Sequence, residues 1–290
     1  MSSPPVLLLF VDGLGLPSDP RAPTPLRPDV CPRLMQLLAE DTVPIDATLG
    51  VPGLPQSATG QTAILTGINA PARAGRHIEG FPGSLLREII REHNIYRQLS
   101  ALGRPSTFAN GYLLPTLEAV RAMRTKSVTT VAALSAFGDV RRLDRLLRGE
   151  AVAHDLTRES LAAHGYTGPC ITIARAAADL AGVAASQAFT LFEFFQTDRA
   201  GHSGDRAEAE AVMRKLDAFL EALCPLAEQA GILLALTSDH GNIEDLSTRR
   251  HTRNPVPFAA RGPGAGTLRA AIRGLTGITP AIVRLLSHPR

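Results

Sequence analysis

The residues with the clearest chemical potential are acids and histidines at the ends of hydrophobic runs. The run "ILLALTSDH" ends on Asp239 and His240, "FTLFEFFQTD" ends on Asp198, and the N-terminal run "VLLLFVD" ends on Asp12. A single acid in such a place is usually a cap or turn residue. Three of them, two with a histidine close by, favour a shared site.

Two more histidines extend this set. His202 follows Asp198 by four residues, a spacing that places both side chains on one face of a helical turn. His251 follows the short basic stretch "STRR" and precedes "NPVP" after two intervening residues. Three carboxylates and three imidazoles suit Zn²⁺ or Mn²⁺. Six ligands are enough for two divalent ions, which together can bind the attacking and leaving oxygens of a phosphoryl transfer.

A nucleophile for such chemistry is offered by the segment "LPQSATGQTAILTG", which contains Ser57, Thr59 and Thr62. It is predicted to be a polar turn that feeds a helix. A hydroxyl at a helix N-terminus lies where backbone N–H groups favour an anion. Thr59, followed by Gly60, is predicted as the nucleophile, and simple capping by Ser57 or Thr59 is the alternative.

Composition excludes several other classes of protein. The chain has 290 residues, 44% hydrophobic and 20% charged, with a net charge of +3, which is typical of a globular protein with a sizeable core. The arginine excess is diffuse, so no nucleic-acid partner is predicted. No apolar run reaches the roughly 20 residues that span a bilayer, and the three cysteines lack CxxC spacing. The expectation is a cytoplasmic protein that contacts no membrane. The sequence indicates no oligomeric state.

The arrangement of hydrophobic segments predicts the fold class. Continuous apolar runs at 6–11, 189–195 and 232–240 predict strands buried on both faces. Amphipathic segments at 83–103 and 205–231 predict helices. This alternation predicts an α/β sandwich with a mostly parallel sheet. Ligand sites in such sheets lie beyond the carboxyl ends of the strands, where the three acids stand.

Four motifs resemble a known family. "FVDGLG", "DRAGH", "TSDHGN" and "HTRNPVP", in this order, resemble cofactor-independent phosphoglycerate mutase and the wider alkaline phosphatase superfamily, including phosphopentomutase. The resemblance implies an alkaline-phosphatase-like three-layer sandwich with a mostly parallel central sheet. It covers 1–75 and 186–290, which are expected to form the metal-binding phosphotransferase core. The stretch 76–185 is expected to be a small inserted cap.

The resemblance also implies the role of each site residue. One ion would be bound by Asp198, His202 and His251, and the other by Asp12, Asp239, His240 and the nucleophile Thr59. Thr59 is chosen because it lies eight residues before Gly67. The implied reaction is phosphoryl transfer from a small phosphate ester through a phospho-threonine. No cysteine stands at this position, which disfavours a sulfatase.

The chain is shorter than the mutases, and this affects the expected reaction. A reduced cap encloses an intermediate less well, which favours a phosphatase over a phosphomutase, the alternative reading. A non-catalytic metal-binding relative is the second alternative. The candidate substrate residues are Arg73, Arg76, His77 and Arg199, near the nucleophile helix or next to a ligand, although solvated surface charges would look the same in the sequence.

Overall fold

A six-stranded sheet forms the centre of the protein. The computed structural model describes residues 3–287, and the strand order is β2-β6-β5-β1-β4-β3. The central strand β1 (Val6–Val11) pairs in parallel with β4 (Phe189–Phe194) and with β5 (Leu233–Thr237).

The outer strands complete a mostly parallel sheet, as predicted. At one edge β3 (Ser106–Phe108) lies parallel to β4. On the other side β6 (Val256–Arg261) runs antiparallel to both β5 and the edge strand β2 (Thr42–Ile45).

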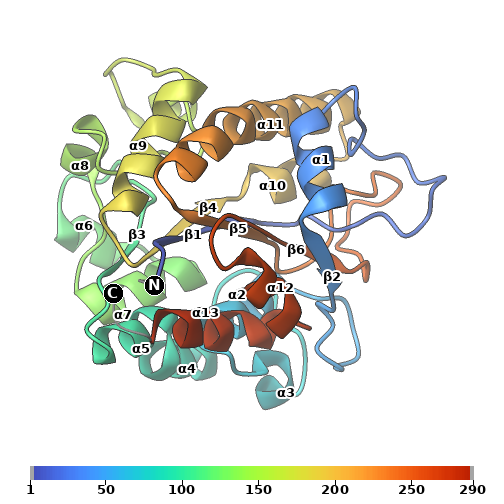
Figure 1. The fold of residues 1–290 in the computed structure, drawn as a ribbon, viewed down its shortest axis with the longest axis horizontal. Coiled ribbons are helices and arrows are strands. Elements are labelled where there is room, and N and C mark those ends of the chain that lie inside the picture. The colour runs from blue at the N-terminus through green and yellow to red at the C-terminus, as the bar shows by residue number, and fades with distance from the viewer. Residues whose placement is uncertain (1–2, 288–290) are drawn as a thin grey trace.

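Helices cover both faces of the sheet (Figure 1). One face carries α1 (Pro32–Glu40), α9 (Ile173–Ala185), α10 (Gln196–Ser203) and α11 (Arg206–Gln229). The other carries α2 (Ser57–Thr66), α3 (Ala70–Ala74), α4 (Ser84–His93), α5 (Ile95–Ala101), α7 (Val128–Phe137), α12 (Ala265–Ala271) and α13 (Ile278–Leu286). Shorter pieces are α6 (Leu117–Ala122), α8 (Leu143–Leu147) and the 3₁₀ turns Glu159–His164 and Leu275–Gly277.

The alternation of side chains along β1 explains why two helical layers are needed. Val6, Leu8 and Phe10 belong to the hydrophobic cluster on the α2 side. Their neighbours, at positions 7, 9 and 11, belong to the cluster on the α11 side. Because successive strand residues point to opposite faces, a strand that is apolar throughout must be covered on both faces.

One predicted helix is wrong in its extent. The segment 83–103 forms two helices, α4 and α5, which are separated at Asn94. Asn94 has an extended backbone, and its side-chain oxygen accepts a hydrogen bond from the N–H of Arg97. This is an N-cap that starts a new helix, a signal that the apolar periodicity on either side concealed.

The stretch 76–185 contributes to the central sandwich. It supplies the edge strand β3, and Ile90 of α4 and Val131 of α7 share a hydrophobic cluster with Val6. A separate small cluster contains Leu146, Ala151, Ala153, Leu161 and Tyr166. A division of the chain into a core and an inserted cap at 76–185 stays a prediction, but these contacts place much of the stretch in the two main clusters.

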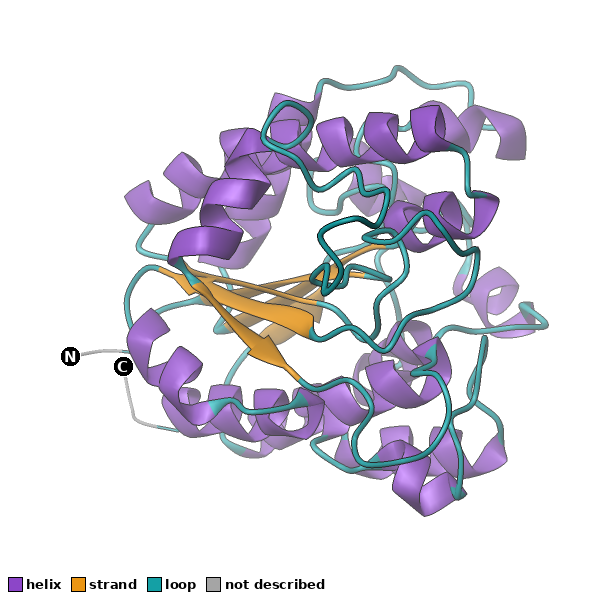
Figure 2. Ribbon diagram, turned by 90° about the vertical axis from the view of Figure 1, so that its right-hand side faces the viewer, coloured by secondary structure: helices purple, strands orange, loops and turns teal. Residues whose placement is uncertain are grey.

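The loops that follow the central strands gather at one end of the sheet. In Figure 2 they lie beyond the end opposite the two termini. This end contains the carboxyl ends of β1, β4 and β5, since the three strands are parallel.

We expect truncation of Ile90 to destabilise the whole protein. Ile90 is fully buried, so Ile90→Ala should lower the free energy of unfolding by about 2–5 kcal/mol. Calorimetry should show a single unfolding transition at a lower temperature. Arg91→Ala, which changes the exposed neighbour of Ile90, should shift the temperature of this transition little. Two transitions, of which only one responds to Ile90→Ala, would instead support an independent cap.

Candidate metal centre

The predicted acids meet at the carboxyl ends of three adjacent strands. Asp12 follows β1, Asp239 and His240 follow β5, and Asp198 lies in the first turn of α10, directly after β4. The backbone N–H of Asp12 donates to the carbonyl of Phe194 at 3.0 Å, which continues the β1–β4 register to the site.

The first cluster consists of Asp12, Asp239 and His240, all buried. One ligand atom from each lies within 4.8 Å of the others. Nε2 of His240 is 3.3 Å from Oδ1 of Asp12 and 3.5 Å from Oδ2 of Asp239. Neither of these oxygens has a hydrogen-bond donor among the described residues. Buried carboxylate oxygens are rarely left without partners, so this arrangement fits a bound cation.

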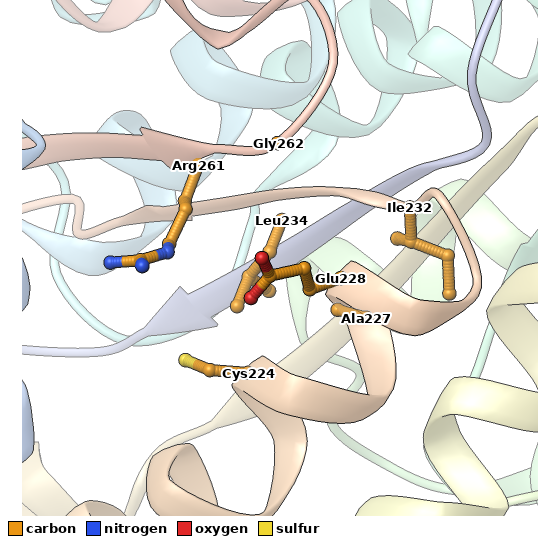
Figure 3. Close-up of a pocket in the computed structure, with 7 residues that line it drawn as sticks. All are labelled: Cys224, Ala227, Glu228, Ile232, Leu234, Arg261 and Gly262. Carbon is orange, nitrogen blue, oxygen red and sulfur yellow. The ribbon is translucent and has the colours of Figure 1, made fainter.

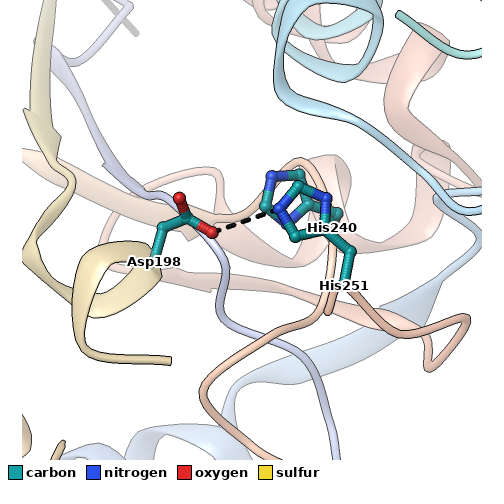
Figure 4. A group of neighbouring side chains, drawn as sticks. All are labelled: Asp198, His240 and His251. Atoms are coloured by element: carbon teal, nitrogen blue, oxygen red, sulfur yellow. Dashed lines mark ion pairs between the residues drawn. The ribbon is translucent and has the colours of Figure 1, made fainter. Parts of the chain in front are cut away.

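The second cluster joins Asp198, His202 and His251. Oδ1 of Asp198 is 3.4 Å from Nε2 of each histidine, and the two Nε2 atoms are 3.0 Å apart. Asp198, His240 and His251 also form a compact group (Figure 4). The rings of His240 and His251 are stacked, with centroids 3.6 Å apart, so the two clusters adjoin.

Backbone carbonyls fix the orientation of two of these histidines. Nδ1 of His202 lies 2.8 Å from the carbonyl of Arg249, and Nδ1 of His251 lies 2.9 Å from that of Pro55. A carbonyl only accepts, so each Nδ1 carries a hydrogen and the Nε2 of each neutral ring presents a lone pair. The two lone pairs and the Asp198 carboxylate therefore converge on one point, the usual orientation of histidines that bind a metal.

The pKa shifts of the first cluster show that burying its charged groups together is unfavourable without a cation. Burial, together with the charges of Asp239 and Asp198, raises the pKa of Asp12 well above its usual range. Burial and the charge of Asp198 raise the pKa of Asp239 to about 7. Burial and the neighbouring His251 lower the pKa of His240 to about 3. Buried carboxylates that repel one another and a neutral imidazole form a donor set that a divalent cation would stabilise.

Asp198 behaves differently from the other two acids. Burial acts to raise its pKa, but two hydrogen bonds outweigh burial and lower the pKa to about 2: one from Nε2 of His251, when this nitrogen carries a proton in the metal-free protein, and one from Asn242. Asp198 is therefore the anionic member of the second cluster.

Ser57, and not Thr59, faces the two clusters. Oγ of Ser57 lies 2.9 Å from Nε2 of His240. Thr59 is fully buried. Its hydroxyl donates a hydrogen bond to the carbonyl of Gln56 at 3.2 Å and accepts one from the N–H of Ile78, also at 3.2 Å. The geometry thus favours Ser57 over Thr59, which was chosen by counting back from Gly67.

Close packing explains the position of Ser57. A Cβ at Gly60 would lie 2.9 Å from both Cβ and the carbonyl oxygen of Asp239. Gly60 therefore allows the first turn of α2 to lie directly against Asp239. Ser57, the first residue of that turn, is then next to His240.

A cavity of about 500 Å³ opens beside the clusters. Its lining includes Ser57, Asp198, His202, His251, Gln56, Leu54, Glu79, Gly80, Arg249 and Arg250. An adjoining cavity of about 380 Å³ shares Leu54, Gln56, Glu79 and Arg250 with it and adds Arg76 and His77.

Only two of the four candidate substrate residues lie together. Arg76 and His77 line the second cavity, and Nε2 of His77 is 3.2 Å from the carbonyl of Val51. Arg73 lines neither of these two cavities. Arg199 lines another cavity, with Gln196 and Lys215, and its guanidinium lies 5.9 Å from the ring centroid of Phe195.

A smaller cavity lies elsewhere, between α11 and the strands β5 and β6. It has a volume of about 150 Å³ and is lined by Cys224, Ala227, Glu228, Ile232, Leu234, Arg261 and Gly262 (Figure 3). It includes none of the clustered acids or histidines.

The sequence of the whole chain identifies its family. Residues 5–288 match the sequence model of the Metalloenzyme superfamily. The chain belongs to the Metalloenzyme superfamily.

The relatives that this chain resembles in sequence include phosphoglycerate mutases. The 2,3-bisphosphoglycerate-independent phosphoglycerate mutase of Halobacterium salinarum is 35% identical over 107 residues, which cover 34% of this chain and 21% of the mutase. The Myxococcus xanthus enzyme of the same name is 36% identical over 111 residues, 35% of this chain and 21% of the mutase. These matches confirm the predicted mutase-like resemblance, although the aligned part spans about a fifth of each mutase.

Solved structures confirm the predicted fold class. The PH0037 protein from Pyrococcus horikoshii superposes with a TM-score of 0.62 at 15% identity, covering 100% of this chain and 99% of that one. Alkaline phosphatase from the Antarctic bacterium TAB5 gives a TM-score of 0.53 at 15% identity, covering 98% and 99%. This metalloenzyme thus has an alkaline-phosphatase-like fold. Within residues 3–287, no helix has the length and apolar character needed to cross a membrane.

We expect Asp239→Asn to have opposite effects on stability with and without metal. Because the folded-state pKa of Asp239 is raised to about 7, the metal-free protein loses stability as pH rises from the usual carboxyl range through 7. After chelation, Asp239→Asn should therefore melt above the parent at pH 8, and the gap should close towards pH 4. With Mn²⁺ at pH 8 the order should reverse, because the parent binds the ion more tightly.

Differential scanning fluorimetry with and without chelator measures both effects. Glu88→Gln, an exposed acid on α4, is the control. A chelated Asp239→Asn protein that melts below the parent at pH 8 would contradict the assignment of Asp239 to a strained acidic cluster.

Proposed function

We propose that this metalloenzyme hydrolyses a small phosphate ester through a phosphorylated Ser57. The observation that carries the proposal is the position of the Ser57 hydroxyl, 2.9 Å from Nε2 of His240, beside both ligand clusters and on the wall of the larger cavity.

The proposal includes two divalent ions, Mn²⁺ or Zn²⁺. Asp12, Asp239, His240 and Ser57 would hold one, and Asp198, His202 and His251 the other. When bound, the ions would supply positive charge to the phosphate oxygens and to the serine hydroxyl. The oxygen atoms without donors in the first cluster and the converging lone pairs in the second support this division.

The remaining chemistry uses residues of the chain. Ser57 stands at the N-terminus of the ten-residue helix α2, where backbone N–H groups favour a phosphate anion. Its oxygen would form a bond to phosphorus and release the hydroxyl proton to solvent, while the ester P–O bond breaks and the leaving oxygen takes a proton from solvent. Water would then attack phospho-Ser57, releasing inorganic phosphate and restoring the hydroxyl.

Access of water favours hydrolysis over a mutase reaction. The side chain of His202 is 46% exposed, so solvent reaches the second cluster. A mutase would have to keep water from phospho-Ser57 while the substrate turns. Phosphomutase activity is the second candidate, supported by the aligned mutases.

We also propose that the substrate carries a second anionic group. The side chains of Arg76 and Arg250 are exposed and form no ion pair with a described residue, and both line the cavity that adjoins the clusters. His77, in the same wall, has a pKa lowered by burial. An arginine without an acidic partner beside a phosphate site is suited to a carboxylate or a further phosphate.

Ser57→Ala should lower the turnover of 4-nitrophenyl phosphate by about 10³-fold or more. It should reduce the affinity for metal much less. Thr59→Ser should retain turnover, since its hydroxyl only bonds to the backbone. Mass spectrometry after an acid quench should find one phosphoryl group on the peptide containing Ser57. Full activity of Ser57→Ala would refute the nucleophile, and absence of activity and of metal in the parent would favour a non-catalytic relative.

Arg250→Ala should raise KM about tenfold for esters with a second anionic group, since one charge-assisted hydrogen bond contributes about 1.5 kcal/mol. The rise should be smaller for 4-nitrophenyl phosphate. The assay compares phosphate esters with and without a carboxylate, 3-phosphoglycerate among them, and follows both free phosphate and isomer. Arg73→Ala is the matched control, and equal KM changes for both ester classes would contradict the second anion site.

A further inference from the structure

Glu244 is a fully buried acid within the loops of the metal centre. It lies between His240 and His251 in the chain and is 0% exposed. It forms no ion pair with any residue in the described part of the chain. Burying a carboxylate without a cationic partner is costly, so its hydrogen bonds must compensate.

Four hydrogen-bond donors surround this carboxylate. Oε2 accepts from the backbone N–H of Gly15 at 3.0 Å and of Asn242 at 2.7 Å. Oε1 accepts from the hydroxyl of Thr252 and from Nδ2 of Asn254 at 3.0 Å. A carboxylate has two oxygens that only accept, so it can satisfy four donors. A neutral amide of the same size cannot, because its NH₂ group is itself a donor.

The donors belong to the three segments that carry metal-ligand candidates. Gly15 is three residues after Asp12, Asn242 is two after His240, and Thr252 is next to His251. One side chain therefore fixes the relative positions of the loops that follow β1 and β5 and of the returning loop before β6.

Asn242 extends the connection to the remaining segment. Its Nδ2 donates to Oδ1 of Asp198 at 2.7 Å and to the backbone carbonyl of Asp198 at 3.1 Å. Because the backbone N–H of Asn242 donates to Glu244, the segments that carry the three acidic ligand candidates are joined in one hydrogen-bonded network.

Two glycines of the sequence motifs make room for Glu244. A Cβ at Gly15 would lie 2.3 Å from Cδ of Glu244, and one at Gly241 would lie 2.3 Å from its Oε1 and 2.2 Å from Oγ1 of Thr252. Neither glycine has a positive φ. Space, and not backbone conformation, requires glycine at both positions.

We propose that Glu244 is a positioning residue of the metal centre, which holds the ligand segments at the spacing that binds metal. The proposal rests on the metal centre of the proposed function. It gives one physical reason for the motif residues Gly15, Gly241, Asn242, Thr252 and Asn254, none of which is among the candidate ligands.

Glu244→Gln tests the proposal, because it keeps the shape and replaces one acceptor oxygen by an amide that must face two donors. We expect Mn²⁺ affinity, measured by isothermal titration calorimetry, to fall about 10- to 100-fold. The electron paramagnetic resonance spectrum of bound Mn²⁺ should also change. Glu88→Gln is the control. A purely structural role would lower the melting temperature and leave both the affinity and the spectrum as in the parent, which would overturn the proposal.

A second pair of variants covers failure of Glu244→Gln to fold. Thr252→Ser keeps the hydroxyl donor and should bind Mn²⁺ like the parent, whereas Thr252→Val removes it and should bind more weakly. Equal affinities of the two would overturn the proposal while leaving the metal centre intact. Absence of Mn²⁺ binding by the parent itself would instead overturn the proposed function, and this inference with it.

Discussion

The mutual repulsion of buried carboxylates at one end of the sheet is the constraint on which the rest of the site depends. Asp12 and Asp239 each bury an oxygen that has no donor among the described residues, and burial raises the pKa of both. A folded chain retains such an arrangement only when other interactions hold it in place. The parallel strands β1, β4 and β5 and their hydrophobic packing on both faces supply those interactions.

The histidines of the same site are oriented by the backbone so that they can bind a cation. Carbonyls of Arg249 and Pro55 direct the Nε2 lone pairs of His202 and His251 inward, and burial lowers the pKa of His240 to about 3. Neutral imidazoles are the form that binds metal. The orientation is therefore set by backbone that lies outside the clusters, in loops which are themselves anchored.

Glu244 shows how these loops are anchored without competing for the cation. Its carboxylate uses its acceptor capacity on four donors from the loops. Asp12 and Asp239, by contrast, keep an oxygen free of donors. The same chemical group thus serves as candidate ligand or as support, according to the donors around it.

The sequence by itself predicted the three central strands, the need for helices on both faces of the sheet, and the acids and histidines of the clusters. Continuous apolar runs specify strands buried on both faces, and an acid directly after such a run must lie at the carboxyl end of the sheet. The sequence alone could not specify β3, because this strand has only three residues at the sheet edge. Nor could it specify the helix break at Asn94, where an N-cap interrupts a continuous hydrophobic pattern.

Only the tertiary structure shows that Ser57, and not Thr59, lies next to His240, and that Glu244 lies among four donors. Which hydroxyl of α2 faces His240 depends on how the helix lies against Asp239, and Gly60 sets that contact. Glu244 draws donors from Gly15 and from Asn254, which are 229 and 10 residues away. Local periodicity reports which face of an element is buried. It carries no information about which distant loop will supply a partner, because that depends on the packing of the whole sheet.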